Sequence, residues 1–214
     1  MCSNRALNPP VATAVFVGRD AELDSLLAAL TTSARLVTVT GAGGIGKTEL
    51  AAEAVRRYRT ATGVPVRWIR LAQVARGSGR ATVEEEIVGS VVGSVPSGGR
   101  AANVIADALA AATAAARRSR VLLVLDNCEH VRDGVAAMLP DLMGTVPGLI
   151  VLATSREAIG LDVEQTIVGP PVNPGAARDI FRRAPPQVRP RPNPKTHQAA
   201  GPQLVTPAHQ TRNI

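Results

Sequence analysis

The chain has 214 residues, 45% of them hydrophobic and only 2% aromatic, which is enough for one α/β domain with a core of Val, Leu, Ile and Ala. Its two cysteines, Cys2 and Cys128, exclude a disulfide framework or a zinc cluster and fit a reducing cytosol. The formal net charge is +7, but residues 182–214 hold six Lys or Arg and no acid, so most of this charge belongs to a tail.

The N-terminal residues lack the basic start and apolar run of a secretory signal. The longest alanine-rich run, residues 104–116, is too short to span a bilayer. We therefore expect a cytoplasmic protein that does not enter a membrane. Residues 1–14 are predicted to be a disordered leader. The first helix is predicted to begin with Asp20 as its N-cap and to carry a leucine stripe typical of core packing, formed by Leu23, Leu26, Leu27 and Leu30.

A glycine-rich stretch, residues 41–48, reads GAGGIGKT and matches the P-loop pattern G-x-x-x-x-G-K-[ST] at every fixed position. A strand is predicted before it at residues 36–40 and a helix after it at residues 49–59. Glycines let backbone N–H groups wrap a phosphate chain, and the helix N-terminus adds positive potential. Lys47 would reach the β- and γ-phosphates, and the Thr48 hydroxyl would hold Mg²⁺. A plain glycine turn is the alternative, but strand, loop and helix together predict a nucleotide phosphate site.

The middle of the chain is predicted to continue the alternation of strands and helices. Residues 64–71 are typical of a second strand, in which Trp68 is a packing residue. A capping box beginning at Thr82 predicts a helix to about residue 95. A turn is predicted at residues 96–99, followed by an alanine-rich helix over residues 100–118.

Residues 120–126 form a nearly continuous apolar run that ends in Asp126. Such runs are typical of strands buried on both faces of a parallel sheet, and ligands bind at the carboxyl ends of these strands. Beside a P-loop, Asp126 is the expected Walker B carboxylate that holds Mg²⁺ through water. The alternative is an aspartate that caps the next turn.

The next predicted elements are a helix at residues 131–143, bent at Pro140, and a buried strand at residues 149–154. Arg156 follows this strand, where it could contact a γ-phosphate. It could equally be a solvated arginine paired with Glu157, and the spacing leaves both interpretations open. A short strand at residues 165–168 and a helix opened by Asn173 and Pro174 are predicted before the tail.

The tail begins at residue 185 and contains seven of the sixteen prolines, without apolar periodicity. It is predicted to be extended or disordered. A nucleic-acid-binding role through this basic tail is an alternative function. That role predicts salt-sensitive binding that survives mutation of Lys47 but is lost when residues 185–214 are deleted.

Four segments carry a family resemblance in their order and spacing: residues 16–23, the P-loop, residues 123–130 (LVLDNCEH) and residues 153–157 (ATSRE). They closely resemble the STAND class of P-loop ATPases, which is related to NB-ARC and AAA+ domains. The nearest resemblance is to the nucleotide-binding domain of large bacterial ATP-binding regulators of the LuxR/AfsR type. It covers roughly residues 15–183.

The resemblance implies a three-layer α/β fold with a five-stranded parallel sheet. In this sheet the P-loop strand would lie near the centre, and the strands of Asp126 and Thr154 would lie beside it. The resemblance also implies that residues 17–19 contact adenine and that Arg156 reads the γ-phosphate. ATP or ADP with Mg²⁺ would switch the protein between open and closed forms, with self-association on ATP binding as one consequence. DNA would be bound only indirectly, through domains that this chain lacks.

The sequence departs from the pattern of a hydrolytic P-loop enzyme at Asn127, which stands where a second acid usually orients the attacking water. Glu129 could replace that acid, so slow ATP hydrolysis or binding without useful hydrolysis is expected. The predicted catalytic residues are Lys47, Asp126, Glu129 and Arg156, and the predicted metal ligands are Thr48 and Asp126. The predicted nucleotide contacts are Val17, Gly18, Arg19, Gly41, Ala42, Gly43, Gly44, Ile45, Gly46, Lys47, Thr48 and Glu49.

The predicted organisation is a leader at residues 1–14, a P-loop NTPase domain at residues 15–184 and a disordered basic tail at residues 185–214. Members of the resembled family continue into a helical lid, a winged helix and often a DNA-binding helix-turn-helix. The proline-rich tail begins where that lid would continue. A truncated regulator is therefore expected, with a non-functional remnant as the alternative.

Overall fold

Strands and helices alternate along the chain in this computed structural model, which describes residues 19–92 and 99–169. The elements are α1 (Asp20–Thr31), β1 (Leu36–Thr40), α2 (Lys47–Thr62), β2 (Val66–Arg70), the 3₁₀ turn η1 (Leu71–Gln73), α3 (Arg80–Val91), α4 (Ala101–Ala116), β3 (Val121–Asp126), α5 (Arg132–Thr145), β4 (Leu149–Ser155) and β5 (Glu164–Val168). The predicted leader, most of the turn at residues 96–99, the helix from Asn173, the tail, Val17 and Gly18 lie outside the described residues.

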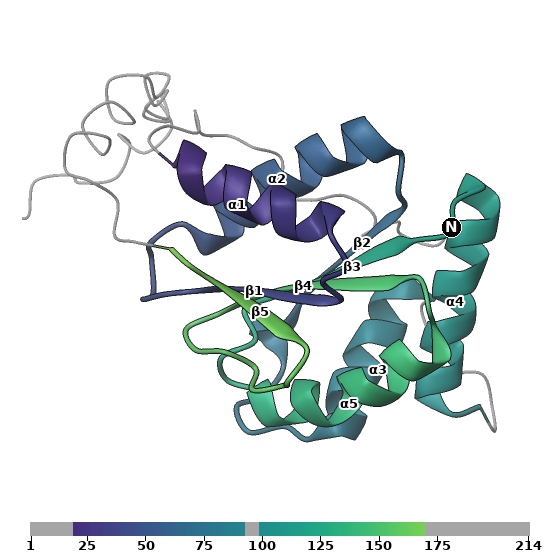
Figure 1. Ribbon diagram of the computed structural model, residues 1–214. Coiled ribbons are helices and arrows are strands. Elements are labelled where there is room, and N and C mark those ends of the chain that lie inside the picture. Colours follow the sequence, from purple (N-terminus) through teal and green to yellow (C-terminus); the bar gives the residue numbers. More distant parts are fainter. Residues whose placement is uncertain (1–18, 93–98, 170–214) are drawn as a thin grey trace, which may run out of the picture. The chain divides into compact units, whose positions relative to one another are not determined.

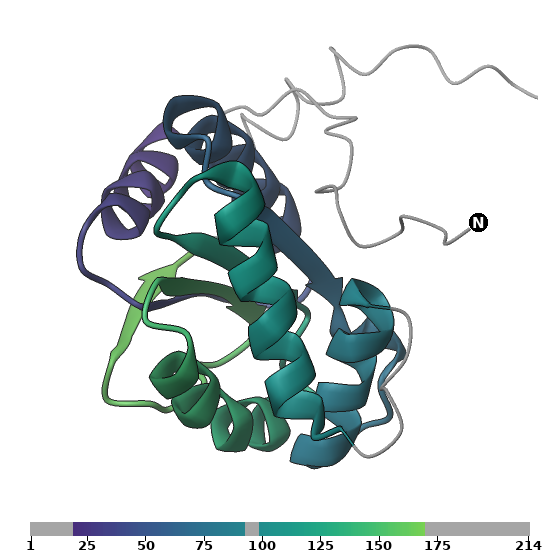
Figure 2. The same cartoon turned by 90° about the vertical axis from the view of Figure 1, so that its right-hand side faces the viewer.

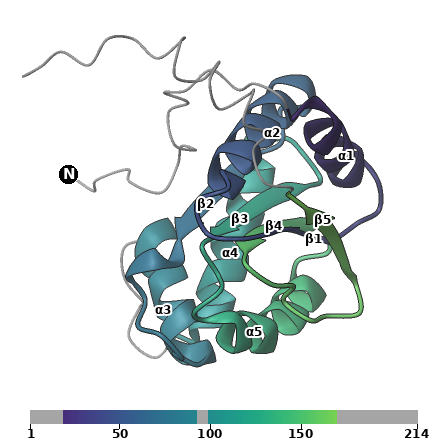
Figure 3. The same ribbon diagram turned by 90° about the vertical axis from the view of Figure 1, so that its left-hand side faces the viewer.

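The five strands form one parallel sheet in the order β2-β3-β4-β1-β5, which confirms the predicted fold class. Figure 3 shows β2, β3 and β4 in succession across the sheet, with β1 and β5 together beyond β4. The predicted neighbours of the P-loop strand are only half right. The strand β4, which carries Thr154, pairs directly with β1, but β3, which carries Asp126, is one strand further away. The reason is that the chain returns through α5 and inserts β4 between β1 and β3.

Helices cover both faces of the sheet (Figure 1), with α1 and α2 on one face and α3, α4 and α5 on the other. Figure 2 shows α4 beside α3, with α5 near them on the same face. A hydrophobic core lies on each face of the sheet, and alternate residues of β3 point into one or the other. Leu123 and Leu125 pack towards α3, α4 and α5. Leu122 and Val124 pack towards α1 and α2. Burial on both faces explains the apolar run that the sequence shows there.

Several helix boundaries differ from the predicted ones. Asp20 is the first residue of α1 rather than its cap, because Arg19 occupies the N-cap position. The predicted capping box at Thr82 does not form, since α3 already begins at Arg80. The acid that the box would use, Glu85, lies inside the helix, and its neighbour Glu84 accepts a hydrogen bond from Arg80 Nε at 2.6 Å. At α5 the difference is small: the helix continues past Pro140, as predicted, and ends at Thr145, two residues beyond the predicted end. No helix in the described part of the chain combines the length and apolar character needed to cross a bilayer.

Arg35, which stands just before β1, ties the start of this strand to the end of α5. Its Nη2 donates to the backbone carbonyls of Met143 and Val146 at 2.7 and 3.0 Å, and its Nε donates to that of Leu149 at 3.4 Å. Met143 lies in the last turn of α5, where carbonyls lack partners within the helix, whereas Val146 is the C-cap of the helix and Leu149 begins β4. One side chain therefore closes the α5–β4 connection.

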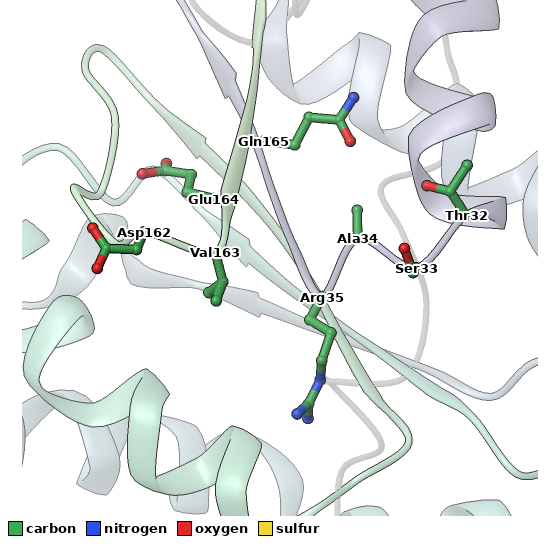
Figure 4. Close-up of a pocket in the computed structure, with 8 residues that line it drawn as sticks. All are labelled: Thr32, Ser33, Ala34, Arg35, Asp162, Val163, Glu164 and Gln165. Carbon is green, nitrogen blue, oxygen red and sulfur yellow. The ribbon is translucent and has the colours of Figure 1, made fainter.

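Beside Arg35 lies a shallow pocket of about 420 Å³, lined by residues 32–35 and 162–165 (Figure 4). These residues lead into β1 and β5, so the pocket lies at the amino ends of the strands. The P-loop follows the carboxyl end of β1. The pocket and the P-loop are therefore at opposite edges of the sheet.

Replacing Arg35 with alanine is expected to lower the free energy of unfolding by about 2 kcal/mol, because three carbonyls lose a charged donor. For a domain of this size, that loss corresponds to a midpoint roughly 4–8 °C lower in thermal unfolding followed by circular dichroism. Arg120→Ala is the matched control, since Arg120 Nη2 makes one exposed bond, to the Thr32 carbonyl at 3.1 Å. Equal midpoints for the two variants would contradict the role given to Arg35.

Candidate nucleotide site

The loop between β1 and α2 has a backbone shape that requires glycine at specific positions. Gly41 has φ of 144°, and a Cβ there would stand 2.3 Å from Ile45 Cδ1 and 2.9 Å from the Gly169 carbonyl oxygen. Gly46 has φ of 83° and is the left-handed residue immediately before α2. Residues with a side chain rarely adopt either conformation. The shape of the turn therefore explains why the P-loop pattern has glycine at positions 41 and 46.

Lys47, the first residue of α2, directs its ammonium group back into this loop. Its Nζ donates to the carbonyl oxygens of Gly41 and Ala42, at 2.9 and 3.0 Å. The residue is largely buried, whereas Ala42, Gly43 and Gly44 are exposed. The arrangement puts a positive charge inside the curve of the loop and at the N-terminus of a 16-residue helix. Both features favour a bound anion.

Thr48 and Asp126 meet, although they are far apart in the sequence. The Thr48 hydroxyl donates to Asp126 Oδ1 at 2.7 Å, and the Thr154 hydroxyl donates to the same oxygen at 2.6 Å. Because α2 packs across β4, it carries Thr48 over the intervening strand to β3. Side-chain alternation puts Asp126 and Thr154 on the face of the sheet that α2 covers. Asp126 is only 6% exposed, so its interactions are screened little by solvent.

This oxygen set fits Mg²⁺ chemically. Mg²⁺ is usually held by one or two carboxylates together with substrate phosphates and waters, rather than by a cage of protein ligands. Thr48 and Asp126 offer one hydroxyl and one carboxylate beside the loop. Within residues 19–92 and 99–169, no group of three or more His, Cys, Asp or Glu could hold a metal ion.

Asn127, the residue after the Walker B aspartate, turns its side chain away from the P-loop. It has φ of 70°, and its backbone N–H donates to the Thr154 hydroxyl at 2.9 Å. Its Nδ2 lies 3.4 Å from His130 Nδ1, and His130 Nε2 lies 3.0 Å from the Leu71 carbonyl oxygen. A carbonyl can only accept, so Nε2 carries the proton and Nδ1 accepts from the asparagine amide. The amide is thereby held towards η1, which follows the far strand β2.

Glu129 and Arg156 form an ion pair beside the loop. Arg156 Nε lies 3.2 Å from Glu129 Oε1, and the arginine and glutamate side chains are 61% and 17% exposed. The Arg156 guanidinium lies over the loop, since its Nη2 would be 3.5 Å from a Cβ built on Gly43. The second oxygen of Glu129, Oε2, is buried without a hydrogen-bond partner. The predicted alternative, a solvated Arg156 paired with Glu157, is wrong in its partner, because Glu157 pairs with Arg132 at 3.0 Å instead.

Arg19 also lies on the loop, although the sequence resemblance implies a contact with adenine. Its guanidinium donates to the Ile45 carbonyl and, at 3.4 Å, to the Gly46 carbonyl, and the residue is buried. Arg19 therefore supports the second half of the loop. Glu49 is exposed in the first turn of α2. The adenine contact of residues 17–19 stays a prediction.

Cys128 lies between the acids of this site but has no catalytic chemistry. Its Sγ donates to the Leu125 carbonyl at 3.3 Å inside the core. Burial raises the pKa of this thiol far above its ordinary value, and the nearby carboxylates Asp126 and Glu129 act in the same direction. The protonated thiol is neither a good nucleophile nor a metal ligand.

Two residues in contact with the site were not identified from the sequence as site residues, namely Thr154 and His130. Thr154 could have been found, because it is a hydroxyl residue at the predicted carboxyl end of a buried strand, where ligands bind in open α/β sheets. His130 could not, since its role depends on the carbonyl of Leu71, which comes from a distant turn.

Two solved structures have a similar fold. The Orc1 protein of Aeropyrum pernix, solved in complex with DNA, aligns with a TM-score of 0.58 and 22% identity, over 81% of this chain and 50% of that one. Cdc6p of Pyrobaculum aerophilum aligns with a TM-score of 0.58 and 18% identity, over 82% of this chain and 51% of that one. At these identities the likeness concerns the fold alone.

Two relatives from Mycobacterium tuberculosis are similar in sequence. An uncharacterized protein is 36% identical over 160 residues, which are 74% of this chain and 37% of the relative. A second protein, named "Putative HTH-type transcriptional regulator", is 36% identical over 142 residues, which are 64% of this chain and 14% of the relative. The chain thus spans only a part of each. The sequence profile of the family described as "AAA ATPase domain" matches residues 15–152, which include the loop, Lys47, Thr48 and Asp126. The chain belongs to this AAA ATPase domain family.

Proposed function

We propose that this chain is an ATP- and ADP-binding domain of the STAND type, and that it works as the nucleotide-dependent switch of a transcriptional regulator. One observation carries the proposal. The Lys47 ammonium, the Thr48–Asp126 pair and the Arg156 guanidinium, from three different parts of the chain, all lie around one glycine loop. Phosphate recognition needs such a combination of cation, metal-ligating oxygens and exposed backbone N–H groups.

Each group has a distinct role in this proposal. The loop amides hold the β-phosphate, and Lys47 turns from the carbonyls of Gly41 and Ala42 to the β- and γ-phosphates. Thr48 and Asp126 hold Mg²⁺, which when bound neutralises negative charge on the phosphate oxygens. Arg156 contacts the terminal phosphate from its position over Gly43.

Hydrolysis would depend on Glu129. Asn127 is engaged with His130 on the side of β2, whereas Glu129 lies beside Arg156 at the loop. In the proposed step a water oxygen attacks the γ-phosphorus, the carboxylate of Glu129 takes the water proton, and ADP leaves. Because Asn127 supplies no carboxylate beside Asp126 to orient the water, we expect slow turnover.

The regulatory part of the proposal is supported by the relative named as an HTH-type transcriptional regulator. This chain spans 14% of that protein, so an effect on transcription would require domains outside the matched part. Within a LuxR/AfsR-type regulator, ATP binding would open the domain and promote self-association in the cytoplasm, and hydrolysis would reset it.

Thermal unfolding of the full chain with Mg-ATP, with Mg-ADP and without nucleotide tests the proposed binding. A nucleotide at about 100 times its dissociation constant should stabilise the folded state by about 2.7 kcal/mol. The midpoint should rise by roughly 5–10 °C. Mg²⁺ with inorganic phosphate at the same concentration is the control for a non-specific anion effect. A cooperative transition that neither nucleotide shifts would refute the proposed function.

A further inference from the structure

The ion pair between Glu129 and Arg156 joins the two charged side chains that the proposed chemistry needs separately. Glu129 follows β3 and Arg156 follows the neighbouring strand β4. We propose that this pair is a latch on the nucleotide site, which the terminal phosphate of a nucleoside triphosphate opens and a diphosphate leaves closed. The inference rests on the proposed function and specifies how the same site is regulated.

The geometry of Arg156 permits an exchange of partners without movement of the backbone. Its only hydrogen bond to the described residues is the single Nε contact to Glu129, although its terminal Nη2 lies over Gly43. The backbone on both sides is fixed, because the N–H of Cys128 donates to the Thr154 carbonyl at 2.9 Å and that of Asn127 to the Thr154 hydroxyl. Rotation of the exposed arginine side chain is therefore sufficient.

The exchange is favourable only when a terminal phosphate is present. An arginine that binds a phosphate with two parallel N–H groups interacts more strongly than one that makes a single contact with a carboxylate. The β-phosphate of a diphosphate would be enclosed by the loop amides and Lys47. It therefore offers Arg156 no comparable partner.

The burial of Glu129 explains why the carboxylate is affected when Arg156 leaves it. Its side chain is 17% exposed, and its Oε2 already lacks a partner, which is unfavourable for a buried carboxylate. Once Arg156 turns to the phosphate, both carboxylate oxygens require a donor, and a water molecule beside the γ-phosphate can supply it. The latch thus keeps the arginine and the base inactive together and releases them together.

The first test is Glu129→Gln in the full chain, with dissociation constants measured for ATP carrying a non-cleavable β–γ bridge and for ADP. Loss of the competing carboxylate should tighten the ATP analogue by about 2- to 5-fold, the range expected for a partly exposed ion pair. ADP affinity should change by less than about twofold. Glu157→Gln is the matched control, because it neutralises the neighbouring acid, whose pair with Arg132 does not contact the loop.

A double-mutant cycle separates the latch from simple repulsion between Glu129 and the phosphates. In an Arg156→Gln background, the latch predicts that Glu129→Gln no longer changes the ratio of ATP-analogue to ADP affinity. Direct repulsion predicts that the increase persists. If Glu129→Gln does not unfold cooperatively, Glu129→Ala takes its place. This substitution also removes the acceptor of the Arg156 hydrogen bond.

The outcomes distinguish the latch from the function on which it rests. An unchanged or lowered affinity ratio in Glu129→Gln, or an increase that persists without Arg156, overturns the latch while nucleotide binding stands. A native chain that binds neither nucleotide overturns the proposed function and the latch with it.

Discussion

Replacement of Lys47 by alanine is expected to weaken ATP binding by roughly 10- to 100-fold, the effect of losing a charged hydrogen-bond donor at a buried anion. The ammonium already lies within the loop, bonded to the carbonyls of Gly41 and Ala42, so it needs only to change acceptors when phosphates bind. Calorimetric titration with Mg-ATP measures the loss directly. In thermal unfolding, the stabilisation by nucleotide should disappear at concentrations that shift the native chain.

Arg59→Ala is the matched control for Lys47→Ala, because it removes one cation from the exposed last turn of the same helix. Its ATP affinity should stay within about twofold of the native value, since an exposed charge several turns away is screened. A folded Lys47→Ala protein with native ATP affinity would refute the assignment of the phosphate site. Equal losses in both variants would indicate a general effect of positive charge rather than a site.

Asp126→Asn is expected to abolish most of the Mg²⁺ dependence of nucleotide binding. The asparagine side-chain oxygen can still accept from the hydroxyls of Thr48 and Thr154, so the fold should be kept while the negative charge is lost. In the native chain, Mg²⁺ should strengthen ATP binding well beyond the affinity measured in EDTA. In the variant, titrations with and without Mg²⁺ should agree to within about threefold, because a neutral amide is a poor ligand for a hard dication.

The control for Asp126→Asn is Asp141→Asn, which neutralises an exposed acid paired with Arg80 on the face away from α2. This variant should keep the Mg²⁺ dependence of the native chain. Were Asp126→Asn to retain the full difference between Mg²⁺ and EDTA, Asp126 would not be a metal ligand, and the carboxylate would serve only to hold the two hydroxyls.

The parts of the molecule that local sequence determines could be predicted. The glycine loop encodes its own turn, because Gly41 and Gly46 occupy conformations that other residues avoid. The buried strands could be recognised because a parallel sheet covered on both faces needs continuous apolar runs, as in residues 121–125. The apolar run predicts Asp126 at the carboxyl end of a parallel strand. Because the P-loop also follows the carboxyl end of its strand, both are predicted at the same edge of the sheet.

The remainder depends on contacts between distant segments. Nothing in the sequence shows that β4 lies between β1 and β3, since strand order follows from how α5 packs before the chain returns. The partner of Arg156 likewise depends on how two neighbouring loops pack, and the spacing alone left a pair with Glu157 and a phosphate contact equally open. The capping pattern at Thr82 failed because α3 begins two residues earlier, at Arg80, whose side chain contacts Glu84 and also Asp141 on α5.

The separation of Arg35 from the glycine loop has a practical consequence for protein engineering. The two groups lie at opposite ends of β1, a five-residue strand that spans roughly 16 Å. Effects of substitutions at that distance usually add. A weakened connection between α5 and β4 should therefore lower the unfolding midpoint of the protein and a strengthened one should raise it, while the increment caused by nucleotide stays the same. Variants of this chain can be brought into a convenient melting range without altering what they bind.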